Sequence, residues 1–167
     1  MKANWFAVTI ILLAGIIAWS AWPNIHHTLK ATTNQTGQIT AGYATGRVEF
    51  SDTTVTVQIP ATVALQELGL GGRTQLGANE GMLFEFDQPQ RYRFWMKGML
   101  MPLDFIWIAN GQVVDLTPDV GAPSNQASPD LPTYQPAAPV TAVLEVNAGF
   151  AARHGLVIGQ AVQIDKN

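Results

Sequence analysis

The sequence predicts a mainly β domain of the α+β class: a small barrel-like domain with two short helices, preceded by one N-terminal transmembrane helix. Three observations lead to this prediction. Short segments alternate apolar and polar residues with the period of a β-strand. Turn-forming residues separate these segments, and one long apolar segment lies near the N-terminus. The chain of 167 residues has room for a single domain after that segment.

The N-terminal apolar segment covers residues 5–22, WFAVTIILLAGIIAWSAW, and contains no charged side chain. A helix of this length is about 27 Å long, close to the roughly 30 Å hydrocarbon core of a bilayer. Tryptophans at both ends favour the membrane interface. The alternative is a signal peptide cleaved near residues 18–20. We expect residues 1–4 in the cytoplasm and the domain outside it, anchored to the cytoplasmic membrane, or periplasmic or secreted after cleavage.

Residues 23–46 are rich in Thr, Asn, Gln and Gly and lack apolar periodicity, which predicts a flexible tether. The globular domain is then expected over residues 47–165. His26 and His27 lie in the tether, but two adjacent histidines without a third ligand do not define a metal site. We therefore predict no metal and no cofactor.

Alternating apolar residues predict the strands of the domain, which we expect to be consecutive and linked by hairpins. Asn110 and Gly111 form the strongest hairpin signal. Helices are expected at residues 61–68 and at residues 148–154, the second opened by Asn147. Residues 117–139 hold six of the ten prolines and predict an extended surface loop. The predicted strands are residues 47–51, 54–59, 82–87, 93–98, 104–109, 112–116, 140–146 and 162–164.

Composition excludes several classes of function. Charged residues make up only 13% of the chain and form no basic run, so nucleic acid is not expected as a partner. The absence of cysteine excludes disulfides, thiol catalysis and thiolate metal sites.

Two carboxylates interrupt otherwise apolar strands. Asp104 shares a strand face with Ile106 and Ile108, and Glu145 lies in the middle of the segment VTAVLEV. A buried carboxylate needs a partner or takes up a proton. The functional interpretation is a small-ligand site with apolar walls, for which the candidate binding residues are Arg73, Trp95, Lys97, Asp104 and Glu145. In the structural interpretation, the two carboxylates bind loop amides and Lys97 extends into water.

Six motifs resemble, in order and spacing, the family of the domain of unknown function 192: GLGGR (69–73), EGMLFEFDQP (80–89), FWMK (94–97), PLDFIWI (102–108), GQVVDL (111–116) and VLEVNAG (143–149). The resemblance implies a small β-rich, barrel-like domain, often exported or membrane-tethered in bacteria, without an established activity. Gly98 and Met99 depart from the family pattern, which has Asn-Thr after FWMK.

The leading functional hypothesis is a membrane-tethered binding or accessory module for a small molecule or a peptide, because no catalytic constellation is visible. Two alternatives stay open. One is a hydrolase that uses Asp104 and Glu145 as a carboxylate pair. The other is a structural module that contacts proteins through residues 117–139.

Overall fold

We analysed a computed structural model, which describes residues 42–126, 128 and 130–167. The predictions for residues 1–4, for the membrane segment 5–22 and for residues 23–41 of the tether lie outside the described residues. Among the described helices, none combines the length and the apolar character that a membrane span requires.

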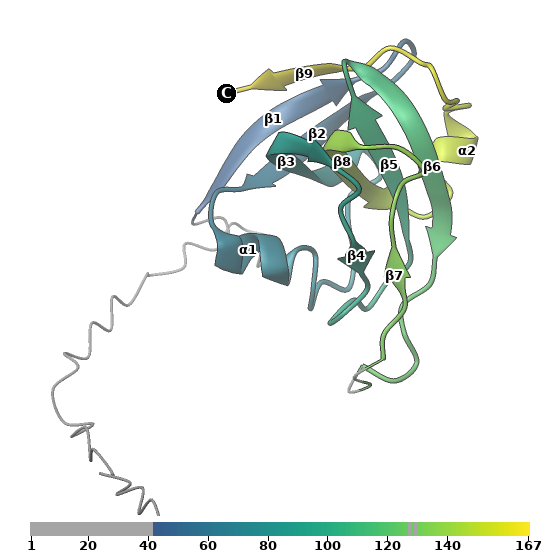
Figure 1. The fold of residues 1–167 in the computed structure, drawn as a ribbon. Helices are drawn as coiled ribbons and strands as arrows, with labels where there is room; N and C mark the ends of the chain where they lie inside the picture. Colours follow the sequence, from purple (N-terminus) through teal and green to yellow (C-terminus); the bar gives the residue numbers. More distant parts are fainter. Residues whose placement is uncertain (1–41, 127, 129) are drawn as a thin grey trace, which may run out of the picture. The chain divides into compact units, whose positions relative to one another are not determined.

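The domain is built on one curved sheet of seven strands, which forms a half-barrel (Figure 1). The strand order across the sheet is β6-β5-β8-β3-β2-β1-β9. A second sheet contains only β4 and β7. The strands of the large sheet are β1 (Tyr43–Glu49), β2 (Thr54–Pro60), β3 (Glu80–Gln90), β5 (Leu103–Ala109), β6 (Gln112–Val120), β8 (Val140–Asn147) and β9 (Gln163–Lys166). The remaining elements are α1 (Val63–Leu68), β4 (Phe94–Trp95), β7 (Thr133–Tyr134) and α2 (Phe150–Arg153).

The predicted mainly β class with two short helices is confirmed for the described residues. Of the consecutive hairpins predicted, those of β1 with β2 and of β5 with β6 form, but the pairing predicted for the other strands is wrong. Strand β3 runs parallel to β2, and both β3 and β5 pair with β8, which comes much later in the sequence. Alternation specifies that a segment is a strand and which face it buries, but it does not specify the partner strand.

The hairpin of β5 and β6 forms where the sequence predicts it. Ala109 pairs with Gln112, and the two residues between them, Asn110 and Gly111, have φ angles of 53° and 68°. Positive φ at both central positions is the geometry of the type I′ turn that Asn-Gly favours.

The predicted strand 93–98 and its hairpin with residues 104–109 are corrected by the structure. Only Phe94 and Trp95 form a strand, β4, and it pairs with β7 instead of β5. Gly98 has a φ of 74°, and the Met99 amide donates to the Met96 carbonyl, so the chain turns before it enters β5.

Residues 117–139 are not a continuous loop, because β6 extends to Val120 and β7 lies within this range. Strand β7 has two residues, too few to show alternation in the sequence. Strand β1 begins at Tyr43, before the expected domain start at residue 47. The helix expected to open at Asn147 begins instead after Gly149. The side-chain amide of Asn147 donates to the carbonyls of Leu76 and Gly77.

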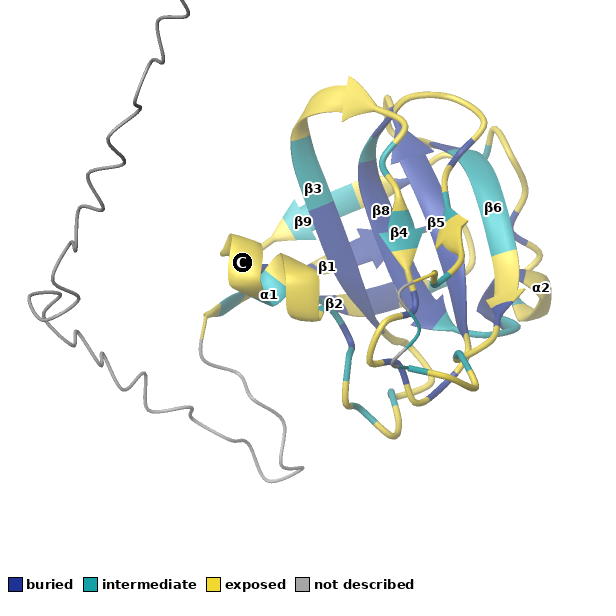
Figure 2. Cartoon of the chain, turned by 60° about the horizontal axis from the view of Figure 1, so that its bottom comes forward, coloured by how far each residue is buried: buried dark blue, intermediate teal, exposed yellow. Residues whose placement is uncertain are grey.

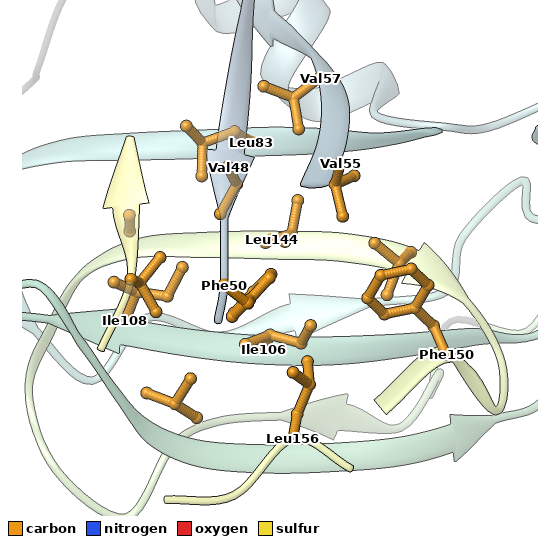
Figure 3. Close-up of a cluster of buried hydrophobic side chains, with 14 of the residues drawn as sticks. Val48, Phe50, Val55, Val57, Leu83, Ile106, Ile108, Leu144, Phe150 and Leu156 are labelled. Carbon is orange, nitrogen blue, oxygen red and sulfur yellow. The ribbon is translucent and has the colours of Figure 1, made fainter. Parts of the chain in front are cut away.

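The large sheet has a separate apolar core on each face. Inside the half-barrel, Val48 and Val55 of β1 and β2 lie opposite Leu144 and Ile106 of β8 and β5 (Figure 3). On the other face, Phe105 and Trp107 of β5 belong to a second core. Strand β4 passes in front of β8 and β5 there, and α1 lies beside it with its residues exposed or only half-buried (Figure 2). The candidate site lies on this second face.

Candidate ligand-binding site

Asp104 lies at the start of β5, on the inner face of the half-barrel, and is 1% exposed. One carboxylate oxygen accepts hydrogen bonds from the amides of Asp119 (2.8 Å) and Gly149 (3.0 Å). The other accepts one from the amide of Ala151 at 2.9 Å. The carboxylate thus connects the end of β6 to the loop that leads into α2. Asp104 thus binds loop amides, as the structural interpretation of the sequence predicts.

Glu145 lies on the opposite face of the sheet from Asp104. In the antiparallel ladder of β5 and β8, Asp104 pairs with Val146, whereas Glu145 pairs with Phe105. Directly paired residues share a face, and neighbouring residues on a strand alternate between faces. On its other side Glu145 pairs with Met82 of β3. The two carboxylates therefore do not share a site.

The Glu145 side chain is mostly buried, but its carboxyl oxygens are open to the pocket, because no fully buried side-chain oxygen among the described residues lacks a partner. The residue is 5% exposed, and its side chain has no hydrogen bond or ion pair with any described residue. Burial raises the pKa of this carboxyl group from 4.5 to about 8. The group is consequently mostly protonated at neutral pH.

Glu145 lines a pocket of about 260 Å³ between α1, β3 and β4. Such a volume accommodates a small organic molecule rather than a long peptide. Most of the wall is apolar, and five aromatic side chains contribute to it: Phe84, Phe86, Tyr92, Phe94 and Trp95. Leu70 and Met99 add aliphatic surface.

The aromatic wall is held together by contacts between rings. The rings of Phe86 and Tyr92 stack with centroids 3.6 Å apart. The Phe94 ring meets the Phe84 ring edge-on at 5.1 Å and the Trp107 ring at 5.5 Å. Edge-to-face contacts of this kind stabilise one arrangement of the rings. The wall is thus shaped by the second core below it.

The mouth of the pocket, defined by Val63, Leu68 and Trp95, exposes apolar surface. These side chains are 70%, 47% and 47% exposed, respectively. Lys97 also lines the pocket, and its Nζ lies 5.2 Å from the centroid of the Trp95 ring. A cation at this distance over an indole is attracted by the ring quadrupole.

Of the five candidate residues, the structure brings Trp95, Lys97 and Glu145 together in one pocket. Arg73 lies elsewhere: its Nη2 donates to Oε1 of Gln58 at 2.6 Å, and its Cζ lies 5.9 Å from the Tyr43 ring centroid. Asp104 is engaged on the inner face, as described above.

Gln126 fixes the turn that follows β4. Its Oε1 accepts a hydrogen bond from the Gly98 amide at 2.7 Å, and its Nε2 donates to the carbonyls of Met99 at 2.7 Å and Pro123 at 3.2 Å. The proline-rich segment thereby holds the wall residues of β4 against the sheet. Gly98 has a positive φ, which glycine adopts freely and asparagine tolerates better than other residues.

Sequence reasoning missed most of the pocket wall. The alternation within β3 was a usable signal, because Phe84 and Phe86 follow Met82 at intervals of two. The contributions of Tyr92 and of α1 had no such signal, since they depend on how loops fold over the sheet. In the part of the chain that the structure describes, no group of three or more His, Cys, Asp or Glu residues could hold a metal ion.

Fold and site together define a small β half-barrel domain with an aromatic pocket on the outer face of its sheet. The chain belongs to the DUF192 family, described as an uncharacterized ACR, whose sequence model matches residues 46–164. This confirms the resemblance found in the sequence motifs. No functionally curated protein matches the chain.

Two solved structures are similar to the domain. One is a crystal structure of a proposed transcription regulator from Sinorhizobium meliloti 1021, with 30% identity and a TM-score of 0.64, covering 73% of this chain and 95% of that one. The other is a protein of unknown function from Novosphingobium aromaticivorans DSM 12444, with 31% identity and a TM-score of 0.60, covering 72% of this chain and 84% of that one.

Proposed function

We propose that this protein is a membrane-tethered, exported binding module whose ligand site is the pocket over Glu145. One observation carries the proposal: Glu145, a residue that is 5% exposed and has no hydrogen-bond partner among the described residues, presents its carboxyl group to an aromatic pocket. Desolvation makes the ionised form of this carboxyl group costly, and it raises the pKa of Glu145. A ligand that pairs with it recovers part of that cost, while the aromatic side chains supply apolar contact area.

Binding fits this pocket better than hydrolysis by a carboxylate pair. The proposed partner of Glu145 in such a mechanism, Asp104, lies on the other face of the sheet and accepts three backbone hydrogen bonds. The remaining charged side chains that line the pocket, Glu67, Arg93 and Lys97, are exposed at its rim. Protein contact through residues 117–139 stays a prediction.

We expect a tryptophan at the mouth to block ligand binding. Val63 is 70% exposed and lines the pocket, so Val63→Trp adds bulk there without disturbing the core. A thermal-shift panel of small molecules, dipeptides and cell-wall fragments on the full chain should contain compounds that raise Tm, because binding to the native state stabilises it. Val63→Trp should remove these shifts.

Val157→Trp is the matched control for this experiment, because Val157 is 60% exposed and does not line the pocket. Its Tm shifts should equal those of the unchanged protein. Shifts that persist in Val63→Trp, or a panel without any shift, would contradict the proposed binding site.

The membrane tether is supported by the apolar residues 5–22. Gly42, the described residue that precedes β1, accepts a hydrogen bond at its carbonyl from the amide of Ala61, just before α1. A reporter enzyme that works only outside the cytoplasm should be active when fused after Asn167. The proposed orientation in the membrane would be overturned if a reporter that works only in the cytoplasm were active at this position and the first reporter were inactive.

A further inference from the structure

We propose that the pocket takes a small organic cation, with an ammonium group against the Glu145 carboxylate and an apolar body against the aromatic wall. This inference rests on the proposed function, because it names the class of ligand for that same pocket. Two features of the pocket select this class independently: the unpaired carboxyl group and the ring surfaces around it.

Once it is ionised, the carboxyl group calls for a partner with positive charge, and a bound cation favours the ionised form. An ionised carboxylate only accepts hydrogen bonds, and its strongest partners are cationic donors. No described residue supplies such a partner to Glu145: the ion pair found between described residues joins Lys166 and Glu85, on a different part of the domain. The ionised form would repel an anionic ligand, and a neutral ligand would gain no charge pairing with it.

The ring surfaces favour the same charge. The faces of aromatic rings attract ammonium groups, most strongly when water is excluded. The domain already contains one such contact, between the Lys97 Nζ and the Trp95 ring at 5.2 Å. A ligand cation inside the pocket would meet the side chains of Phe84 and Phe94 as well.

The other ionisable groups around the pocket do not replace a ligand. Glu67 comes from α1, Tyr92 and Arg93 precede β4, and Lys97 follows it. The strand neighbours of Glu145, Met82 and Phe105, are not ionisable. Arg93 and Lys97 are exposed, so water and salt screen their charges at the rim.

This assignment predicts a characteristic pH dependence. Because burial raises the pKa of Glu145 to about 8, only about one-eleventh of the free protein carries the ionised carboxylate at pH 7. A ligand whose own charge is fixed, and which binds the ionised form, should therefore bind about tenfold more tightly at pH 9 than at pH 7.

The experiment compares choline with 3,3-dimethyl-1-butanol, its neutral carbon analogue, by calorimetric titration of the full chain in maltoside detergent. Choline should bind more tightly than the alcohol, and only choline should gain affinity from pH 7 to pH 9. Glu145→Gln should remove both the preference and the pH effect, and a circular dichroism spectrum checks that this variant is folded. The control Asp52→Asn, which is exposed between β1 and β2 and does not line the pocket, should keep both.

Equal affinity for the two probes, or choline binding that does not change with pH, would overturn the ammonium assignment. If the Val63→Trp variant still blocks other ligands of the panel, the proposed pocket stands and only its ligand class fails. If no compound of any class binds, the proposed function fails together with this inference.

Discussion

Asp104→Asn is expected to lower the free energy of unfolding by about 3 kcal/mol, although the substitution keeps the size of the side chain. The carboxylate accepts hydrogen bonds from three backbone amides, two at one oxygen and one at the other. Asparagine presents an NH₂ group in place of one oxygen, so at least one amide faces a donor instead of an acceptor. The Ala151 amide is buried, and water cannot replace the lost acceptor.

Urea denaturation followed by circular dichroism measures this effect. The matched control is Asp119→Asn. Asp119 is exposed and has a φ of 53°, which asparagine tolerates. Its hydrogen bond to Asp104 comes from its backbone amide, which the substitution keeps. We expect the control to change stability by less than about 0.5 kcal/mol. A decrease in unfolding free energy below about 1 kcal/mol for Asp104→Asn would show that the carboxylate does not hold the end of β6 to the loop before α2.

The consequence for function is that the two buried carboxyl groups have different roles. Asp104 finds all of its partners within the chain, whereas Glu145 finds none among the described residues. A group that the fold satisfies contributes to stability, and a group that the fold leaves unsatisfied is a candidate for binding.

Much of the fold could be predicted from local sequence. Strands such as β2 and β8 alternate, and Asn110-Gly111 fixes the hairpin of β5 and β6. The strand phase also placed Asp104 and Glu145 correctly relative to their neighbours. Pairing between distant strands was not predictable, because the alternation of β3 is equally compatible with any partner.

The site was only partly predictable for a related reason. Sequence patterns show that Glu145 is buried in a strand, but they do not show which loop covers it. Trp95 and Lys97 reach the same pocket through the pairing of β4 with β7, a contact between residues about 40 positions apart that leaves no periodic signal. Arg73, which was grouped with them, contacts Gln58 instead.

Glu145→Gln is expected to stabilise the protein at alkaline pH and to have little effect at acidic pH. Burial raises the pKa of Glu145 in the folded state from 4.5 to about 8. Between these values the folded protein binds a proton that the unfolded chain has lost, so the stability of the unchanged protein falls as pH rises. The cost is absent below pH 4.5 and complete above about pH 8, where it reaches at most about 5 kcal/mol.

The quantity to measure is the difference in unfolding free energy between Glu145→Gln and the unchanged protein, from pH 4.5 to pH 9, because other titrating groups cancel in that difference. It should start near zero and grow by several kcal/mol, with most of the increase completed by about pH 8. Gln66→Ala, which removes no titratable group from the same rim, should give a difference that does not change with pH. A constant difference for Glu145→Gln would mean that the carboxyl group is not desolvated. The pocket would then lack the unsatisfied group on which ligand binding is proposed to depend.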